Sequence, residues 1–173
     1  MAPNATSAGC PETTLIETEL LDGVAVIALN RPEKRNAIND AMRADLIQVL
    51  DWADRSADVR AIIITGRGKG FCAGGDIAAM KERLAAPAGR VGINGWQRQR
   101  RTHHLLTMLH DIPKPTIAAV NGAAAGLGCD LALCCDFVIG ASDATFVMSY
   151  VLRGLIPDGG GMYFLPRRVG MAR

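Results

Sequence analysis

The alternation of apolar and polar residues divides the chain into short strands and longer helices. Two apolar runs flank Asp22-Gly23, a residue pair that favours a tight hairpin turn. Apolar residues three and four positions apart predict amphipathic helices over Ala41 to Arg55 and over Trp96 to Asp111. The predicted strands are Leu15–Leu20, Val24–Leu29, Ala61–Thr65, Thr116–Val120, Phe137–Ile139 and Thr145–Met148, and a last helix is expected from near Met162.

Polar and small residues mark the boundaries of these elements. Asn39 or Asp40 can cap the first helix, because short polar side chains accept hydrogen bonds from the free N–H groups of a first turn. The stretch Ala85 to Gly95 has the composition of a mobile loop, and Pro113 and Pro115 end the helix after it.

Length and composition indicate one globular domain. The chain has 173 residues, 49% of them hydrophobic and 21% charged, with a formal net charge of +2. We expect a flexible tail over residues 1–13 and a single core domain over residues 14–173. The near-neutral charge argues against a nucleic-acid partner, and no apolar run reaches the roughly 20 residues that cross a membrane. With no secretory signal or presequence pattern, the expected location is cytoplasmic.

The five cysteines fit this expectation. They are odd in number and form no CxxC pair, so they are interpreted as reduced, mostly buried small residues: Cys10, Cys72, Cys129, Cys134 and Cys135. A reactive thiol at Cys72 is the alternative. Adjacent His103 and His104 point in different directions on a helix and have no partner at ligand spacing, so no metal site is expected.

Two glycine-rich turns follow buried strands and carry the candidate chemistry. One is TIAAVNGAAAGLGCDLALCCD from Thr116 to Asp136, where a strand passes through small residues into a helix. The other is GRGKGFCAGGDI from Gly66 to Ile77. Small residues let a ligand approach the backbone, and the free N–H groups of a helix start stabilise negative charge, so each turn can aim one N–H at the same oxygen. Tight packing of strand against helix is the alternative explanation.

A dinucleotide site is a weaker interpretation of the second turn. Gly68 to Ala73 formally fits G-x-G-x-x-A after a strand, but no acidic residue ends a following strand about 20 residues later, as such a site requires.

Together with LNRPEKRNAI at Leu29–Ile38 and GLIPDGGGMYFLPRRVG at Gly154–Gly170, these turns resemble the crotonase (enoyl-CoA hydratase/isomerase) superfamily. The resemblance implies an α/β fold, the crotonase (ClpP-like) spiral of ββα repeats. It also implies further C-terminal helices, which we expect to be missing from this chain, and a homotrimer or a hexamer built as a dimer of trimers.

The resemblance further implies an acyl-CoA substrate, with no cofactor because CoA is part of that substrate. The oxyanion hole would consist of the backbone N–H groups of Ala73 and Leu127. The positions that match substrate-binding or CoA-binding sites of the family are Arg35, Ala37, Ile38, Gly74, Gly75, Asp76, Ile77 and Gly126. Asp76 can instead cap the helix that follows it, and the basic run Gln97–Arg101 is either a solvated face or a contact for CoA phosphates.

Proton transfer would fall to three side chains at matching positions. Asp130 and Tyr150 stand where the hydratases of the family have two glutamates, and Tyr150 is a poor base because the reference pKa of tyrosine is about 10. Asp158 matches a catalytic Asp of isomerase-type and dehalogenase-type relatives, where one carboxylate shuttles a proton between carbons. We therefore favour double-bond isomerisation over hydration, and a non-catalytic acyl-CoA binder is the alternative. In that case Asp158 would be an N-cap and Asp130 a first-turn acid.

Overall fold

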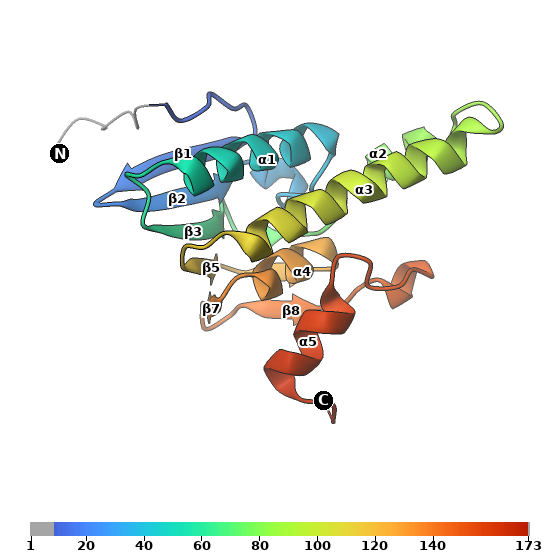
Figure 1. The fold of residues 1–173 in the computed structure, drawn as a ribbon. Helices are drawn as coiled ribbons and strands as arrows, with labels where there is room; N and C mark the ends of the chain where they lie inside the picture. Colours follow the sequence, from blue (N-terminus) through green and yellow to red (C-terminus); the bar gives the residue numbers. More distant parts are fainter. Residues whose placement is uncertain (1–8, 173) are drawn as a thin grey trace.

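The computed structural model describes residues 9–172. It contains two sheets, and repeated units along the chain contribute strands to both of them (Figure 1). The larger sheet has the order β1-β2-β3-β5-β7, and the smaller has the order β4-β6-β8. The strands of the larger sheet are β1 (Ile16–Leu21), β2 (Val24–Leu29), β3 (Ala61–Gly66), β5 (Thr116–Val120) and β7 (Phe137–Gly140). The smaller sheet contains β4 (Gly70–Cys72), β6 (Ala123–Ala125) and β8 (Thr145–Val147).

Each repeat gives one strand to each sheet and then a helix. β3 leads into β4, β5 into β6 and β7 into β8, and every pairing except β1 with β2 is parallel. The helices are α1 (Asp40–Arg55), α2 (Ile77–Leu84), α3 (Arg90–Asp111), α4 (Leu127–Cys134) and α5 (Gly161–Val169), with short 3-10 turns η1 (Pro32–Lys34) and η2 (Val151–Arg153). This arrangement confirms the predicted α/β spiral of ββα repeats.

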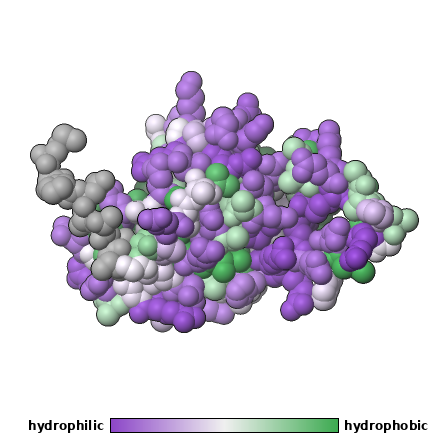
Figure 2. Space-filling model, turned by 90° about the horizontal axis from the view of Figure 1, so that it is seen from above, coloured by the Kyte–Doolittle hydropathy of each residue, from purple (hydrophilic) through white to green (hydrophobic). Residues whose placement is uncertain are grey.

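Hydrophobic patterning places the core between the larger sheet and the helices above it. The apolar face predicted for α1 is fully buried, and α1 packs beside α3. Asn39 caps α1 by accepting a hydrogen bond from the Met42 N–H at 2.8 Å. Viewed from above α1 and α3, the surface is mostly hydrophilic with small separate apolar patches (Figure 2). No helix within the described residues has the length and apolar character needed to span a membrane.

The structure corrects the predicted boundaries at three places. Residues 90–95, expected in a loop, are the first turns of α3, so only residues 85–89 connect α2 to α3. Both glycine-rich turns also contain a short strand that was not predicted, β4 in one and β6 in the other. Of the predicted tail, residues 1–8 lie outside the described residues, and residues 9–13 form no helix or strand.

Candidate active site

The two glycine-rich segments meet because their backbones approach each other without intervening side chains. A Cβ at Gly128 would lie 2.3 Å from the carbonyl oxygen of Cys72, so α4 can rest on the end of β4 only with glycine at this position. A Cβ at Gly74, whose φ is +94°, would lie 2.6 Å from the oxygen of Ala125 and 3.3 Å from the backbone nitrogen of Leu127. The segment after β4 is therefore held directly against the start of α4.

A small cavity lies at this junction. Its volume is about 170 Å³, and its wall includes backbone from both turns and side chains from α3 and the η2 region. Of the predicted site residues, it is lined by Ala73, Gly74, Gly75, Ile77, Gly126, Leu127, Tyr150 and Asp158. The structure thus brings together residues from three of the four sequence motifs.

One predicted oxyanion donor is wrong. The N–H of Ala73 is already used, because it donates to the carbonyl oxygen of Arg35 at 2.9 Å. The N–H of Gly75, two residues on, has no acceptor within residues 9–172. Gly75 pairs in a parallel bridge with Ile38, in which the Ile38 N–H donates to Gly74 and the Asp76 N–H donates to Ile38. In such a bridge the N–H of the central residue points away from the partner strand, and Gly75 is one of the residues that line the cavity.

The other donor is consistent with its prediction. Leu127 is the first residue of α4, so its N–H has no acceptor inside the helix and lies at the positive end of the helix dipole. Gly126 precedes it with φ +50°, a backbone conformation that glycine adopts readily. Two backbone donors, at Gly75 and Leu127, therefore border one cavity.

Asp130 lies behind the cavity wall rather than in it. Its side chain is fully buried in the first turn of α4, it accepts a hydrogen bond from the Tyr150 hydroxyl, and its Oδ1 has no partner within the described residues. Burial raises the pKa of Asp130 to about 6, and the negative charge of Asp158 also raises it, against the opposing effect of the Tyr150 hydrogen bond.

Tyr150 is held as a hydrogen-bond donor. Burial, and then the hydrogen bond to Asp130, raise the pKa of the Tyr150 hydroxyl far above its ordinary value. The hydroxyl therefore stays protonated near neutral pH and is no base.

Asp158 is half-buried and lines the same cavity as Tyr150. It is not the cap of α5, because the N-cap is Gly160 and no side chain caps that helix, so the N-cap alternative is wrong. α3 holds the backbone here: the Gln99 side chain donates to the Asp158 carbonyl oxygen at 3.3 Å, and the His103 ring nitrogen lies 2.9 Å from the same oxygen. A second, open cleft of about 880 Å³ continues from Asp158 between α3 and α5.

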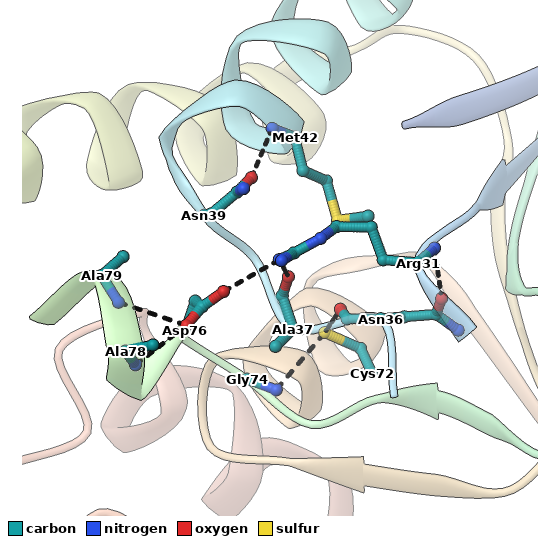
Figure 3. Close-up of polar contacts among 10 residues, drawn as sticks. All are labelled: Arg31, Asn36, Ala37, Asn39, Met42, Cys72, Gly74, Asp76, Ala78 and Ala79. Atoms are coloured by element: carbon teal, nitrogen blue, oxygen red, sulfur yellow. Dashed lines mark hydrogen bonds and ion pairs between the residues drawn. The ribbon is translucent and has the colours of Figure 1, made fainter. Parts of the chain in front are cut away.

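The predicted CoA contacts at Arg35, Ala37, Ile38 and Asp76 do not line the cavity. The Ile38 side chain is buried in the core, and the Asp76 carboxylate accepts hydrogen bonds from the Ala78 and Ala79 N–H groups of α2 (Figure 3). The capping alternative for Asp76 is confirmed. These residues instead surround the segment that carries Gly75, and their contact with CoA stays a prediction.

The alternative of a reactive Cys72 is not supported. The Cys72 thiol is fully buried, its S–H donates to the Asn36 carbonyl oxygen at 3.1 Å, and burial raises its pKa to about 12. Because a thiol attacks as the thiolate, Cys72 is unreactive near neutral pH. Within residues 9–172, no group of three or more His, Cys, Asp or Glu side chains could hold a metal ion.

Sequence reasoning missed two residues that shape this site. Asn36 has φ +56° and its side-chain amide donates to the carbonyl oxygens of Gly70 and Phe71, at 2.9 and 3.1 Å. Arg31 donates to Ala37 and to Asp76. Both residues belong to the LNRPEKRNAI motif, and the polar character of that motif was the only feature of the sequence that could have pointed to them.

Comparison with known proteins gives a consistent result. A family model described as enoyl-CoA hydratase/isomerase matches residues 19–173. The chain is 45% identical over 151 residues to the 1,2-epoxyphenylacetyl-CoA isomerase of Escherichia coli, covering 87% of this chain and 56% of that protein. It is 39% identical over 160 residues to the crotonyl-CoA hydratase of Syntrophomonas wolfei, covering 92% and 58% respectively.

Solved structures agree with these sequence matches. An enoyl-CoA hydratase from Polaromonas superposes with a TM-score of 0.82 at 40% identity, covering 91% of this chain and 60% of that one. The chain thus spans less than two thirds of the length of each of these three relatives.

Proposed function

The chain belongs to the enoyl-CoA hydratase/isomerase family, and from this we propose that it is an enzyme that acts on acyl-CoA thioesters through an enolate. The N–H groups of Gly75 and Leu127 would hold the thioester oxygen as it becomes negatively charged. Donors aimed at a developing oxyanion lower the barrier substantially, since removing one typically costs about 3–4 kcal/mol.

The reaction we favour is movement of a double bond. The observation that carries it is that Asp158 lines the cavity with both donors, whereas Asp130 does not. A single carboxylate beside an enolate can take a proton from one carbon and return it to another, without adding water. Tyr150 would position the acyl group, because its hydroxyl is held by Asp130.

Hydration is the second candidate, and a specific feature of Asp130 favours it. Its Oδ1, which has no hydrogen-bond partner within residues 9–172, and its pKa of about 6 suit a group that gains and loses a proton near neutral pH. For this role the Tyr150 side chain would have to move aside, so that a water reaches Asp130. The cited relatives are named as an isomerase of an epoxide thioester and as a hydratase, and these names do not decide between the two candidates.

Substitution Asp158→Asn tests the favoured reaction. We expect at least a 100-fold loss of kcat for conversion of 3-enoyl-CoA to 2-enoyl-CoA, with the affinity for CoA thioester nearly unchanged, because the amide cannot accept the proton. Asp143→Asn, at an exposed position of the turn before β8, is the matched control and should retain full activity. Retained isomerase activity in Asp158→Asn would contradict the proposal, and thioester binding without turnover in the unmodified protein would support the non-catalytic binder.

The wider setting is part of the same proposal. Acyl-CoA is the expected partner, with no separate cofactor, in a cytoplasmic homotrimer or dimer of trimers. The family membership supports the substrate class.

A further inference from the structure

We propose that Arg31 is a positioning residue for the oxyanion hole, which it serves by clamping the segment that carries Gly75. Arg31 follows β2 and touches neither the cavity nor the second cleft. The inference rests on the proposed function, because it assigns a role within the same site.

A single nitrogen of Arg31 joins the two strands of the bridge (Figure 3). Its Nη1 donates to the carbonyl oxygen of Ala37 at 2.6 Å and to Asp76 Oδ2 at 3.0 Å. Ala37 precedes Ile38 and Asp76 follows Gly75, so the guanidinium spans the paired backbones next to the bridge. The side chains of Arg31 and Asp76 are only 12% and 13% exposed, which strengthens their attraction relative to that of a surface ion pair.

The other oxygen of Asp76 fixes the direction of the segment. Asp76 Oδ1 accepts hydrogen bonds from the N–H groups of Ala78 and Ala79, at 2.9 and 3.2 Å. One carboxylate therefore links Arg31 to the first turn of α2. Partial burial by itself raises the pKa of Asp76, but the hydrogen bonds from Arg31, Ala79 and Ala78 outweigh it and hold that pKa below its ordinary value.

This clamp determines where the Gly75 N–H points. The bridge to Ile38 uses the Gly74 oxygen and the Asp76 N–H, so the Gly75 N–H faces the opposite side. If the two backbones separate, glycine at this position has no side chain to hold its orientation. Misplacement of a catalytic donor by about 1 Å can cost roughly 100-fold in rate, so a residue that touches no substrate can still control kcat.

Three variants test the role of Arg31. Arg31→Met removes both hydrogen bonds, and Arg31→Lys keeps a charged donor. Arg67→Met is the matched control, because Arg67 forms an ion pair of 2.6 Å with Glu17 but its side chain does not contact the clamp. We expect Arg31→Met to lower kcat by 10-fold to 100-fold with KM changed less than about threefold, Arg31→Lys to recover kcat to within about threefold, and Arg67→Met to equal wild type.

Amide hydrogen exchange gives a readout that does not depend on turnover. The amides of Ile38 and Asp76 donate across the bridge, so Arg31→Met should speed their exchange by at least tenfold, and Arg67→Met should not. Unchanged exchange, or equal kcat losses in Arg31→Met and Arg67→Met, would overturn the inference. If the unmodified protein turns over no thioester, the proposed function fails, and the exchange result alone decides the role of Arg31.

A double substitution covers the case in which Arg31→Met does not fold. Asp76→Asn keeps an oxygen that can cap α2 but loses the charge that attracts Arg31. Combined with Arg31→Lys, it should lower kcat no further than the larger single effect, because both substitutions weaken one contact. Additive losses would show that the two residues act independently and would contradict the clamp.

Discussion

At the scale of single residues, the site separates two carboxylates by environment. Asp130 is enclosed by α4, Tyr150 and the glycine turn before α5, where a Cβ at Gly159 would lie 2.2 Å from its Oδ2. Asp158 remains half-exposed at the cavity. Burial favours the protonated form of Asp130, whereas the half-exposed Asp158 is accessible to a substrate.

The raised pKa of Asp130 predicts a pH dependence of stability. Because the pKa rises from 3.8 to about 6 on folding, the stability contributed by protonated Asp130 is fully present below pH 4 and is lost as the pH rises through 6. Between pH 4 and pH 7, wild type should therefore lose on the order of 2–3 kcal/mol of unfolding free energy relative to Asp130→Asn. Urea unfolding of both proteins at pH 4 and at pH 7 measures this difference in unfolding free energy.

The exposed Asp54→Asn variant is the control for this measurement, and its stability should follow that of wild type at both pH values. A constant difference in unfolding free energy between wild type and Asp130→Asn would show that Asp130 ionises normally in the folded state.

Asp130 and Asp158 could be located from the sequence because each stands in a recognisable motif, whereas Tyr150 was located only by its match to the second glutamate of the hydratases. The proposed donor at Gly75 could not be located in this way. Ala73 and Gly75 differ in the direction of their N–H groups, and that direction depends on pairing with Arg35 and Ile38, nearly 40 residues earlier. Local composition carries no information about such a pairing.

At the scale of elements, the strand pairs β3-β4 and β5-β6 each enter a helix through a turn of small residues. The backbones of β4 and α4 are in close contact, because Gly128 packs on the Cys72 carbonyl oxygen. This contact sets the distance between the segment carrying Gly75 and the first turn of α4. It therefore affects both the stability of the fold and the spacing of the two proposed donors.

Substitution Gly128→Ala tests this contact. The added methyl would lie 2.3 Å from the Cys72 oxygen and 2.8 Å from its sulfur, so α4 must move away from β4. We expect a loss of about 1–3 kcal/mol in unfolding free energy, together with reduced turnover. Denaturant unfolding and thioester assays provide the two readings.

Gly92→Ala, inside α3, is the matched control. A Cβ there meets nothing within 4 Å, so alanine should stabilise the helix by about 0.5–1 kcal/mol. Equal effects of the two substitutions would mean that the contact between β4 and α4 is loose.

Helices and long strands followed from hydrophobic spacing, and the differences have physical causes. Arg90 to Gly95 is helical although it contains two glycines, because it continues α3, whose later turns are anchored by Leu105, Leu106 and Leu109 in the core. β4 and β6 have three residues each and are strands only because they pair with each other and with β8. Pairing between distant segments overrides local propensity in such short elements.

At the scale of the whole molecule, large apolar side chains remain exposed on β7 and on η2. Phe137 and Ile139 of β7 are 60% and 64% exposed, and Val151 in η2 is 78% exposed. Exposed apolar groups of this size often mark a surface that another structure covers. Their exposure is consistent with the predicted oligomer, which stays a prediction.

Light scattering coupled to size-exclusion chromatography tests the assembly. We expect the mass of a trimer or a hexamer at micromolar concentration, and Ile139→Lys should reduce it by placing a charge in the contact. The exposed Leu84→Lys, at the end of α2, is the control. A monomer at all concentrations would contradict the predicted assembly.

The most direct test of the account compares two reactions of the whole protein. Purified protein is incubated separately with 3-enoyl-CoA and with crotonyl-CoA, and water addition and 2-enoyl-CoA formation are followed by mass and absorbance. The account predicts formation of 2-enoyl-CoA from 3-enoyl-CoA, without uptake of water by either substrate, because Asp158 borders the cavity and Asp130 does not. Efficient hydration of crotonyl-CoA would contradict it and would assign the activation of water to Asp130.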